Sequence, residues 1–354
     1  MKKIVLTGGG TAGHVTPNIA LIPHLQKAGY EVYYIGSKGG MEEDLIKSCN
    51  IPYYGVSSGK LRRYLDKKNI SDIFKVCKGI FQAKRLIKKI KPDVVFSKGG
   101  FVAVPVVIGS AMNKVNIICH ESDITPGLAN KLAMPFASAV CTTFPEAVKH
   151  IKDNKGIYTG TPIRDSLFKG SRQKGLEICG FSGNKPVILI MGGSQGSVKV
   201  NNSIRGLLSK LLPKYDVVHL CGKGNLDESL KDTTGYVQFE YVSEELPDLL
   251  AMADMVVSRA GSNAICEFLA LHKPMLLIPL GLNASRGDQI LNAKSFKNQG
   301  FAEVLDEEKM TKGSLFDTIN NVYNNRNKYI ENMEKSQAAD GIKAVMEIIR
   351  AATK

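Results

Sequence analysis

The chain carries the same local pattern twice: an apolar run that leads directly into a cluster of glycines. Residues 2–14 read KKIVLTGGGTAGH, and residues 185–197 read KPVILIMGGSQGS. A buried strand that turns through glycines into a helix is typical of the start of a doubly wound α/β domain, because small residues let the helix begin close to the strand. The repeat predicts two such domains, and 354 residues are sufficient for two packed cores.

Strand-like apolar runs alternate with amphipathic stretches of helical periodicity along the rest of the chain. This order favours parallel sheets covered by helices on both faces. We therefore expect an α/β protein with two doubly wound, Rossmann-like domains that face each other across a cleft. The expected strands cover residues 3–7, 31–35, 93–96, 116–119, 138–142, 187–191, 216–220, 236–239, 254–258 and 275–279.

A segment between the two halves is expected to link the domains. Residues 159–175, TGTPIRDSLFKGSRQKG, are rich in glycine, proline and charge. The expected domains are 1–163 and 164–337. The helical stretch at about 338–354 is expected to pack back onto the first domain.

Composition excludes several classes of protein. The seven cysteines are scattered and form no C-x-x-C pair, so we expect neither a disulfide framework nor a zinc site. The start, MKKIVLTGGG, has too few apolar residues for a signal peptide. No apolar run approaches the ~18 residues that would span a bilayer. We expect a protein of the reducing cytosol that is soluble or attached to a membrane surface.

The net charge of +14 is concentrated in one short segment. Residues 60–91 contain twelve lysines and arginines against two aspartates, a net charge of +10, and apolar residues recur at helical spacing over 70–90. One interpretation is a core-facing helix with solvated lysines. The other is an apolar edge ringed by cations at an anionic membrane surface. The localisation of the charge favours an anionic surface or a polyanionic partner over a role in general solubility.

The first glycine cluster, TGGGTAGHVTPN, allows three interpretations. Gly8, Gly10 and Gly13 match G-x-G-x-x-G, but the second strand ends in YYIGSKGG, without the carboxylate that a dinucleotide ribose requires. The glycines can also form nothing more than a tight turn. In the third interpretation their N–H groups face an anion, and His14 lies at the floor of a cleft. An imidazole can take a proton near neutral pH, so His14 is a candidate base, with a purely structural histidine as the alternative.

Two loops of the second half have related features. MGGSQGS follows an apolar strand and lacks the Lys-Ser/Thr pair of a P-loop, so a nucleoside triphosphatase is not expected. In SRAGSNAICE a strand leads into a helix whose free N–H groups suit a diphosphate. Glu267 in this helix either grips two vicinal hydroxyls, such as those of a ribose, or simply complements the helix dipole. A later polar loop adds Asp288 and Gln289, side chains common in sugar sites and in ordinary loops.

Six segments carry a resemblance over nearly the whole chain. In order, they are GGGTAGHVTPN, FSKGGFVAVPVV, CHESDITPGLANK, TGTPIR, MGGSQGS and SRAGSNAICE. In this order and spacing they resemble the MurG family, the bacterial UDP-GlcNAc transferases of peptidoglycan synthesis. The resemblance implies the GT-B fold and an inverting transfer of N-acetylglucosamine from UDP-GlcNAc. The acceptor would be the C4 hydroxyl of MurNAc in lipid I (undecaprenyl-pyrophosphoryl-MurNAc-pentapeptide), and the product lipid II.

The resemblance also implies roles for particular residues. His14 matches the residue usually proposed as general base, and Glu121 is a second acid near the cleft and a rival base. Glu267 would grip the ribose, and uracil would pack against Tyr241 and Val242. The positions that match UDP-GlcNAc-binding residues of the family are Thr11, Ala12, Gly13, Arg164, Ser194, Val242, Glu267 and Gln289.

One departure from the family pattern concerns the donor sugar. The family commonly reads HEQN where this chain reads HESD, so Ser122 and Asp123 replace glutamine and asparagine. The asparagine usually helps to hold the sugar, whereas an ionised aspartate accepts hydrogen bonds but cannot donate them. No residue cluster has metal-ligand spacing, so we expect no metal and no cofactor, with helix N-termini stabilising the departing diphosphate.

The expected partners are UDP-GlcNAc, lipid I and an anionic membrane surface contacted through residues 60–91. This predicts a peripheral protein on the cytoplasmic face of the cell membrane. Nucleic acid is not expected, because no nucleic-acid module is recognisable and the basic segment has few aromatic residues to stack on bases. The alternatives are an NAD oxidoreductase or another GT-B enzyme that uses a UDP-sugar, either a glycolipid glycosyltransferase or a UDP-GlcNAc 2-epimerase.

Overall fold

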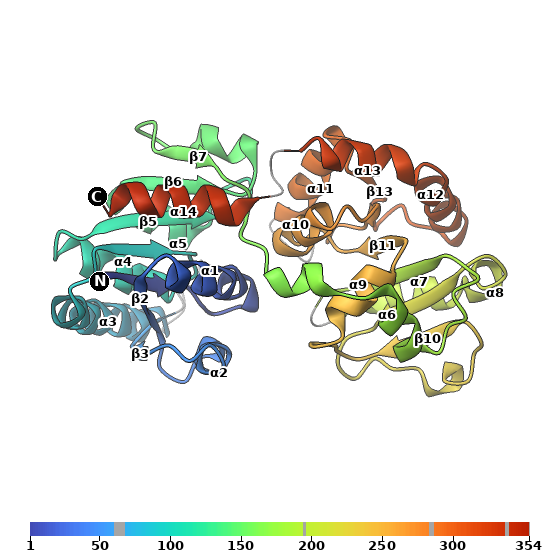
Figure 1. Cartoon of the computed structure of the whole chain (residues 1–354), viewed down its shortest axis with the longest axis horizontal. Helices are drawn as coiled ribbons and strands as arrows, with labels where there is room; N and C mark the ends of the chain where they lie inside the picture. Colours follow the sequence, from blue (N-terminus) through green and yellow to red (C-terminus); the bar gives the residue numbers. More distant parts are fainter. Residues whose placement is uncertain (60–67, 194–195, 283–286, 337–339, 354) are drawn as a thin grey trace. The chain divides into compact units, whose positions relative to one another are not determined.

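The computed structural model describes residues 1–59, 68–193, 196–282, 287–336 and 340–353, without the side chains of 68–71. The chain divides into two compact units (Figure 1). The first consists of Met1–Arg164 and Asp340–Lys354, and the second of Asp165–Ala339. Each unit is built on one parallel sheet, so the expectation of two doubly wound α/β domains is confirmed.

The sheet of the first unit has the strand order β3-β2-β1-β4-β5-β6-β7 among the described residues. From β1 the chain proceeds through β2 to β3 at one edge of the sheet. It then returns to β4, next to β1, and proceeds to β7 at the other edge. Such a reversal leaves a crevice at the carboxyl ends of the two central strands, where doubly wound proteins bind ligands. The strands are β1 (Lys2–Thr7), β2 (Tyr30–Ser37), β3 (Tyr53–Val56), β4 (Val94–Ser97), β5 (Asn116–Glu121), β6 (Ala139–Thr142) and β7 (Gly156–Tyr158).

The second unit repeats this topology in a sheet of order β10-β9-β8-β11-β12-β13, again among the described residues. Its reversal lies between β8 and β11, the two strands that lead into MGGSQGS and SRAGS. These two loops of the second unit therefore lie at the same crevice. The strands are β8 (Val187–Met191), β9 (Asp216–Leu220), β10 (Tyr236–Phe239), β11 (Met255–Ser258), β12 (Met275–Leu277) and β13 (Ala302–Val304).

Helices cover both faces of the first sheet. Alternate residues of β1 point to opposite faces: Ile4 and Leu6 enter one apolar core, and Val5 enters the other. The helices of this unit are α1 (Thr16–Lys27), α2 (Met41–Lys47), α3 (Lys68–Ile90), α4 (Ala103–Ala111), α5 (Leu128–Ala133) and α14 (Gly341–Ala352), with short 3₁₀ segments at Ala12–His14, Met134–Phe136 and Pro145–His150.

The helices of the second unit follow the same arrangement around its own core. They are α6 (Arg172–Cys179), α7 (Val198–Arg205), α8 (Leu208–Leu211), α9 (Leu246–Met252), α10 (Ser262–Ala270), α11 (Asp288–Asn298), α12 (Lys312–Asn324) and α13 (Arg326–Glu334), with 3₁₀ segments at Asp165–Lys169 and Glu228–Leu230.

The last helix of the chain belongs to the first unit. In Figure 1, α14 lies in the unit that contains the N-terminus, although the second unit precedes it in sequence. Val345, Met346 and Ile349 are buried in the same core as Leu21 of α1. Burial of an apolar helix face, worth roughly 25 cal/mol per Å², ties the end of the chain to its beginning.

Among the described residues all ten expected strands form, with ends that shift by up to two residues, and three more strands are present. The additional strands β3, β7 and β13 lie at sheet edges. They have three or four residues and only one or no fully buried position, so they lack an apolar run. The expected linker also differs in part, because α6 begins within it, extends beyond it and packs on α9.

Candidate active site

The crevice of the first sheet contains the first glycine cluster, which we call the glycine loop (residues 8–13). A Cβ atom at Gly8 would collide with the His14 carbonyl and approach Lys98. A Cβ at Gly9 would lie 2.6 Å from the carboxyl carbon of Glu42. Gly10 has a φ of 83°, a conformation that side chains disfavour. The three consecutive glycines are therefore required by close packing and backbone conformation, and not only by a turn.

His14 lies at the carboxyl end of this loop, in the 3₁₀ turn that precedes α1. Its Nδ1 is 2.9 Å from the hydroxyl of Thr11, and the side chain is half-buried. Burial, and then the nearby Lys98 ammonium, lower the pKa of His14 from 6.5 to about 4. The ring is therefore neutral at pH 7. When Nδ1 carries the proton and donates it to Thr11, Nε2 has a free lone pair that can accept a proton.

Lys98 follows β4 and is fully buried. Its Nζ lies 2.9 Å from Nδ1 of His120 and donates to the Ser122 hydroxyl at 2.5 Å. Burial and the Lys98 charge hold the pKa of His120 well below its usual range, and Nε2 of His120 donates to the Gly160 carbonyl. The positive charge that adds to the effect of burial on the pKa of His14 is thus held in place at the ends of two strands.

Glu121, the rival base, is buried at the end of β5. Its carboxylate accepts hydrogen bonds from the backbone N–H of Asp123 (3.0 Å) and Gly127 (3.2 Å) and from the side chain of Asn130 (2.8 Å). Burial raises the pKa of Glu121, and these hydrogen bonds oppose the increase. Three donors directed at one carboxylate are typical of a residue that shapes a loop, here the turn from β5 to α5.

The carboxylate that appeared to be absent after the second strand comes from α2. Glu42 follows β2 by five residues and is fully buried. It accepts hydrogen bonds from the N–H groups of Gly10 and Ser37 and from the Ser37 hydroxyl. Because the carboxylate is buried and directed at the protein's own backbone, it is not presented to a ribose, and the dinucleotide interpretation finds no support in this geometry.

The crevice of the second sheet is a cavity of about 420 Å³, within the usual range for ligand pockets. It lies at the N-termini of α7 and α10, where the first N–H groups of a helix have no partner within the helix. Ser197 caps α7 by accepting from Val200, but α10 has no side-chain cap. The lining residues are Gly192, Gly193, Gly196, Ser197, Ser258, Arg259, Gly261, Ala264, Leu280 and Gln289.

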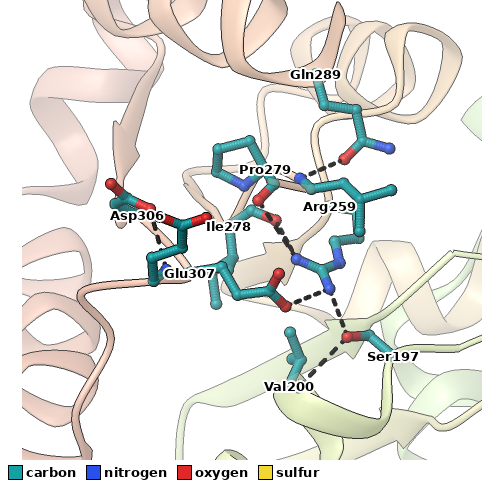
Figure 2. A network of polar contacts seen from close by, with 10 residues as sticks. Ser197, Val200, Arg259, Ile278, Pro279, Gln289, Asp306 and Glu307 are labelled. Carbon is teal, nitrogen blue, oxygen red and sulfur yellow. Dashed lines mark hydrogen bonds and ion pairs between the residues drawn. The ribbon is translucent and has the colours of Figure 1, made fainter. Parts of the chain in front are cut away.

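A buried arginine connects several segments that line this cavity (Figure 2). The guanidinium of Arg259 donates to Ser197 at 2.7 Å and to Glu307 at 2.5 Å. It also donates to the carbonyls of Ile278 and Pro279. These partners compensate the buried charge of Arg259 and join the start of α7 to the ends of β11 and β12. The anion-binding capacity of the cavity therefore resides mainly in its backbone N–H groups.

Gln289 and Glu267 are the expected donor-binding residues at or beside this cavity. The side-chain carbonyl of Gln289 accepts from the backbone N–H of Leu280 at 3.0 Å, so the amide is fixed with its NH₂ group as the donor (Figure 2). Glu267 is half-buried in α10, one turn beyond the helix start that lines the cavity. Tyr241 is exposed and Val242 is buried just after β10.

The other expected site residues have different locations. Ser194 lies outside the described residues. Arg164 is the last residue of the first unit and is half-buried. Thr11 and Ala12 are exposed, and Gly13 is half-buried, on the glycine loop with His14. The structure thus groups Thr11, Ala12, Gly13, His14 and Glu121 in the first unit, and groups Val242, Glu267 and Gln289 in the second.

Sequence reasoning did not assign roles to Glu42, Lys98, Asn130 or Arg259. Lys98, Asn130 and Arg259 lie inside the motifs quoted above, so a closer examination of those motifs could have proposed them. Glu42 lies in none of them, and its only signal is a carboxylate shortly after the second strand. Within the described part of the chain, no group of three or more His, Cys, Asp or Glu residues could hold a metal ion.

Helix α3 presents apolar side chains to solvent. Phe74 and Phe81 are 72% and 63% exposed, and Ile73 and Cys77 are exposed beside them. Ala83, Ile87 and Ile90 of the same helix are buried in the core. One face of α3 thus packs on the core, and another face presents apolar side chains to solvent. Residues 60–67 of the basic segment lie outside the described residues, and none of the described helices has the length and apolarity to span a membrane.

Each half of the chain matches a known family of domains. The glycosyltransferase family 28 N-terminal domain matches residues 4–142, and the glycosyltransferase family 28 C-terminal domain matches residues 187–346. A protein of Clostridium botulinum is 58% identical over 354 residues, 100% of both chains. Its name is UDP-N-acetylglucosamine--N-acetylmuramyl-(pentapeptide) pyrophosphoryl-undecaprenol N-acetylglucosamine transferase. A protein of the same name from Lachnospira eligens is 59% identical over 350 residues, 99% of each chain.

Solved structures agree with these matches. MurG of Acinetobacter baumannii superposes with a TM-score of 0.77 at 25% identity, over 99% of this chain and 100% of that chain. MnaA of S. aureus, solved with UDP, superposes with a TM-score of 0.69 at 14% identity, over 99% of this chain and 96% of that chain, and at this identity it supports the fold alone.

Proposed function

Because the chain belongs to glycosyltransferase family 28, we propose that it transfers N-acetylglucosamine from UDP-GlcNAc to the C4 hydroxyl of MurNAc in lipid I, with inversion at the anomeric carbon. The observation that carries the proposal is 58% identity over the full length of a relative named for this transfer. The product is lipid II, the disaccharide-bearing lipid of peptidoglycan synthesis.

The second unit binds the donor in this proposal. Its cavity offers the uncapped N-terminus of α10 and the glycines after β8, which suit a diphosphate. Gln289 presents an amide donor at the same cavity, and Glu267 grips the ribose. As UDP leaves, negative charge develops on its diphosphate, and fixed N–H donors stabilise that charge without reorganisation.

The first unit provides the base. His14 is neutral at pH 7, and the Thr11 hydroxyl orients its ring, so Nε2 takes the proton as the acceptor oxygen attacks the anomeric carbon. We assign Glu121 to positioning, since its carboxylate already accepts three hydrogen bonds from the loop that follows it. This assignment separates two residues that the sequence left as rivals.

The exposed face of α3 binds the membrane that contains the acceptor. Phe74 and Phe81 lie seven residues apart, two helical turns, on one side of the helix. Lys75 and Lys78 are exposed near them. An apolar edge with cations beside it suits an anionic leaflet, where each basic residue contributes about 1 kcal/mol. The proposed location is peripheral, on the cytoplasmic face of the cell membrane.

A transfer assay tests the proposed reaction. Labelled UDP-GlcNAc is incubated with the full chain and a short-chain lipid I analogue, with and without EDTA, and the lipid product is separated. We expect label in the lipid under both conditions. Conversion of UDP-GlcNAc without acceptor would favour an epimerase, and transfer to diacylglycerol alone would favour a glycolipid transferase. Either result would overturn the proposal.

Vesicle co-sedimentation tests the membrane face. The double variant Phe74→Ser/Phe81→Ser should bind vesicles with anionic lipid less than the unmodified protein, and binding should weaken with salt. Phe168→Ser is the matched control, because Phe168 is similarly exposed but lies in the second unit. Equal retention of both variants, or binding indifferent to lipid charge, would exclude α3 as the contact.

A further inference from the structure

Glu42 connects the end of β2 to the glycine loop. It lies in none of the sequence motifs described above, and the transfer reaction does not assign it a role. We propose that Glu42 is a positioning residue whose carboxylate holds Gly10, and with it the segment that carries His14, in the geometry required for transfer. The proposal rests on the proposed function, because its effect is exerted on the candidate base.

The two carboxylate oxygens serve different elements. Oε1 accepts hydrogen bonds from the backbone N–H of Ser37 at 2.8 Å and from the Ser37 hydroxyl, at the end of β2. Oε2 accepts from the backbone N–H of Gly10 at 3.3 Å, across 32 residues of sequence. The carboxylate therefore bridges a rigid strand end and the loop, one residue before Thr11.

Three glycines make space for this carboxylate. A Cβ at Gly9 would lie 2.6 Å from the Glu42 carboxyl carbon, and one at Gly40 would lie 2.6 Å from Oε1. A Cβ at Gly36 would lie 2.9 Å from Cγ of Glu42. The side chain is fully buried, so it cannot move aside into solvent. Packing and hydrogen bonding thus specify the same position for the carboxylate.

The chemistry requires a carboxylate in particular. Both oxygens face N–H donors, and glutamine would replace one acceptor oxygen with an NH₂ donor. Either Gly10 or Ser37 would then face a donor and lose its partner. The Gly10 hydrogen bond is the longer of the two, so the loop is the side expected to be released. A displacement of about 1 Å at a catalytic group can reduce turnover about a hundredfold.

Lys98 is a second charged group beside the loop and His14, which it approaches from the end of β4. Of the two, Glu42 from α2 is the group that accepts a hydrogen bond from the loop backbone. Its role is therefore to fix position, whereas Lys98 influences the charge state of His14.

The test compares Glu42→Gln with Glu43→Gln. Glu43 lies next to Glu42 on α2, but its carboxylate accepts from Gly39 and pairs with Lys47, away from the loop. In the transfer assay, Glu42→Gln should lower kcat about ten- to hundredfold and leave the Kd for UDP, bound by the second unit, within about twofold. Glu43→Gln should retain kcat. Hydrogen exchange should accelerate in the peptide that contains Gly10 only in Glu42→Gln.

Gly9→Ala provides an independent test if Glu42→Gln does not fold. It keeps the charge and pushes the carboxylate from the opposite side, so kcat should fall with UDP affinity intact. Near-normal kcat in a folded Glu42→Gln or Gly9→Ala variant would overturn the proposal, as would an equal loss in Glu43→Gln. If the unmodified protein fails to transfer N-acetylglucosamine, the proposed function fails, but the exchange result for Gly10 still tests the anchor.

Discussion

Replacement of Lys98 by methionine should move the acidic limb of the pH–rate profile. Cβ of Lys98 lies beside the glycine loop, and burial of His14 and the Lys98 charge together lower the pKa of His14 from 6.5 to about 4. Methionine has a similar length and no charge, so the burial remains and the repulsion is removed. A neutral His14 should then persist over a narrower pH range.

The size of the effect follows from the order of the two causes. The total lowering is about 2.5 pH units, from 6.5 to about 4, and burial is the larger contribution. Lys98 therefore accounts for less than half, at most about 1.2 pH units. We expect the acidic limb to rise by about 1 pH unit. At pH 5 the unmodified enzyme should keep about nine-tenths of its plateau rate, and Lys98→Met about half.

The assay is kcat/KM for the lipid I analogue between pH 4 and pH 8, since this ratio reports the ionisation of the free enzyme. Lys98→Arg retains the charge and should leave the limb in place, even if its plateau is lower. The Kd for UDP, which we propose is bound by the second unit, serves as a measure of intact folding. A limb that stays at the same pH in Lys98→Met would refute the electrostatic role of Lys98, His14 as the base, or both.

Three further predictions concern single residues. His14→Ala should lower kcat at least about tenfold with near-normal UDP affinity, measured by transfer and by calorimetry, and near-normal turnover would discard His14 as the base. Glu267→Ala should weaken UDP binding at least about tenfold, and an unchanged Kd would refute its ribose role. Burial, and then the Arg205 charge, lower the pKa of His219 to about 3, so the unfolded state binds the proton first and stability is lost as pH falls below 6.5. Between pH 7 and pH 5, the free energy of unfolding should fall by about 2 kcal/mol because of His219. Urea denaturation of His219→Gln should therefore show a weaker pH dependence of stability. An unchanged pH dependence would contradict the role of His219.

The central strands of both sheets could be predicted because each is a short apolar run buried on both faces. Ile188, Leu189 and Ile190, for example, are fully buried in succession, and such a run is visible in the sequence. The edge strands β3, β7 and β13 could not, because an edge strand is covered less and needs fewer apolar residues. The two glycine clusters indicated both crevices for the same local reason, since a tight turn after a strand is encoded where it occurs.

The amino-acid sequence by itself determined the two-domain α/β class, the family motifs and the candidate residues His14, Glu267 and Gln289. Only the tertiary structure decided how the site is supported. Glu42 meets Gly10 across 32 residues, and Lys98 meets His120 across 22. Contacts of this kind depend on the order of strands in the sheet, and that order leaves no periodicity in the chain. Local patterns therefore indicate the candidate ligand-binding groups, whereas the contacts that hold these groups in position become visible only when the strands are assembled.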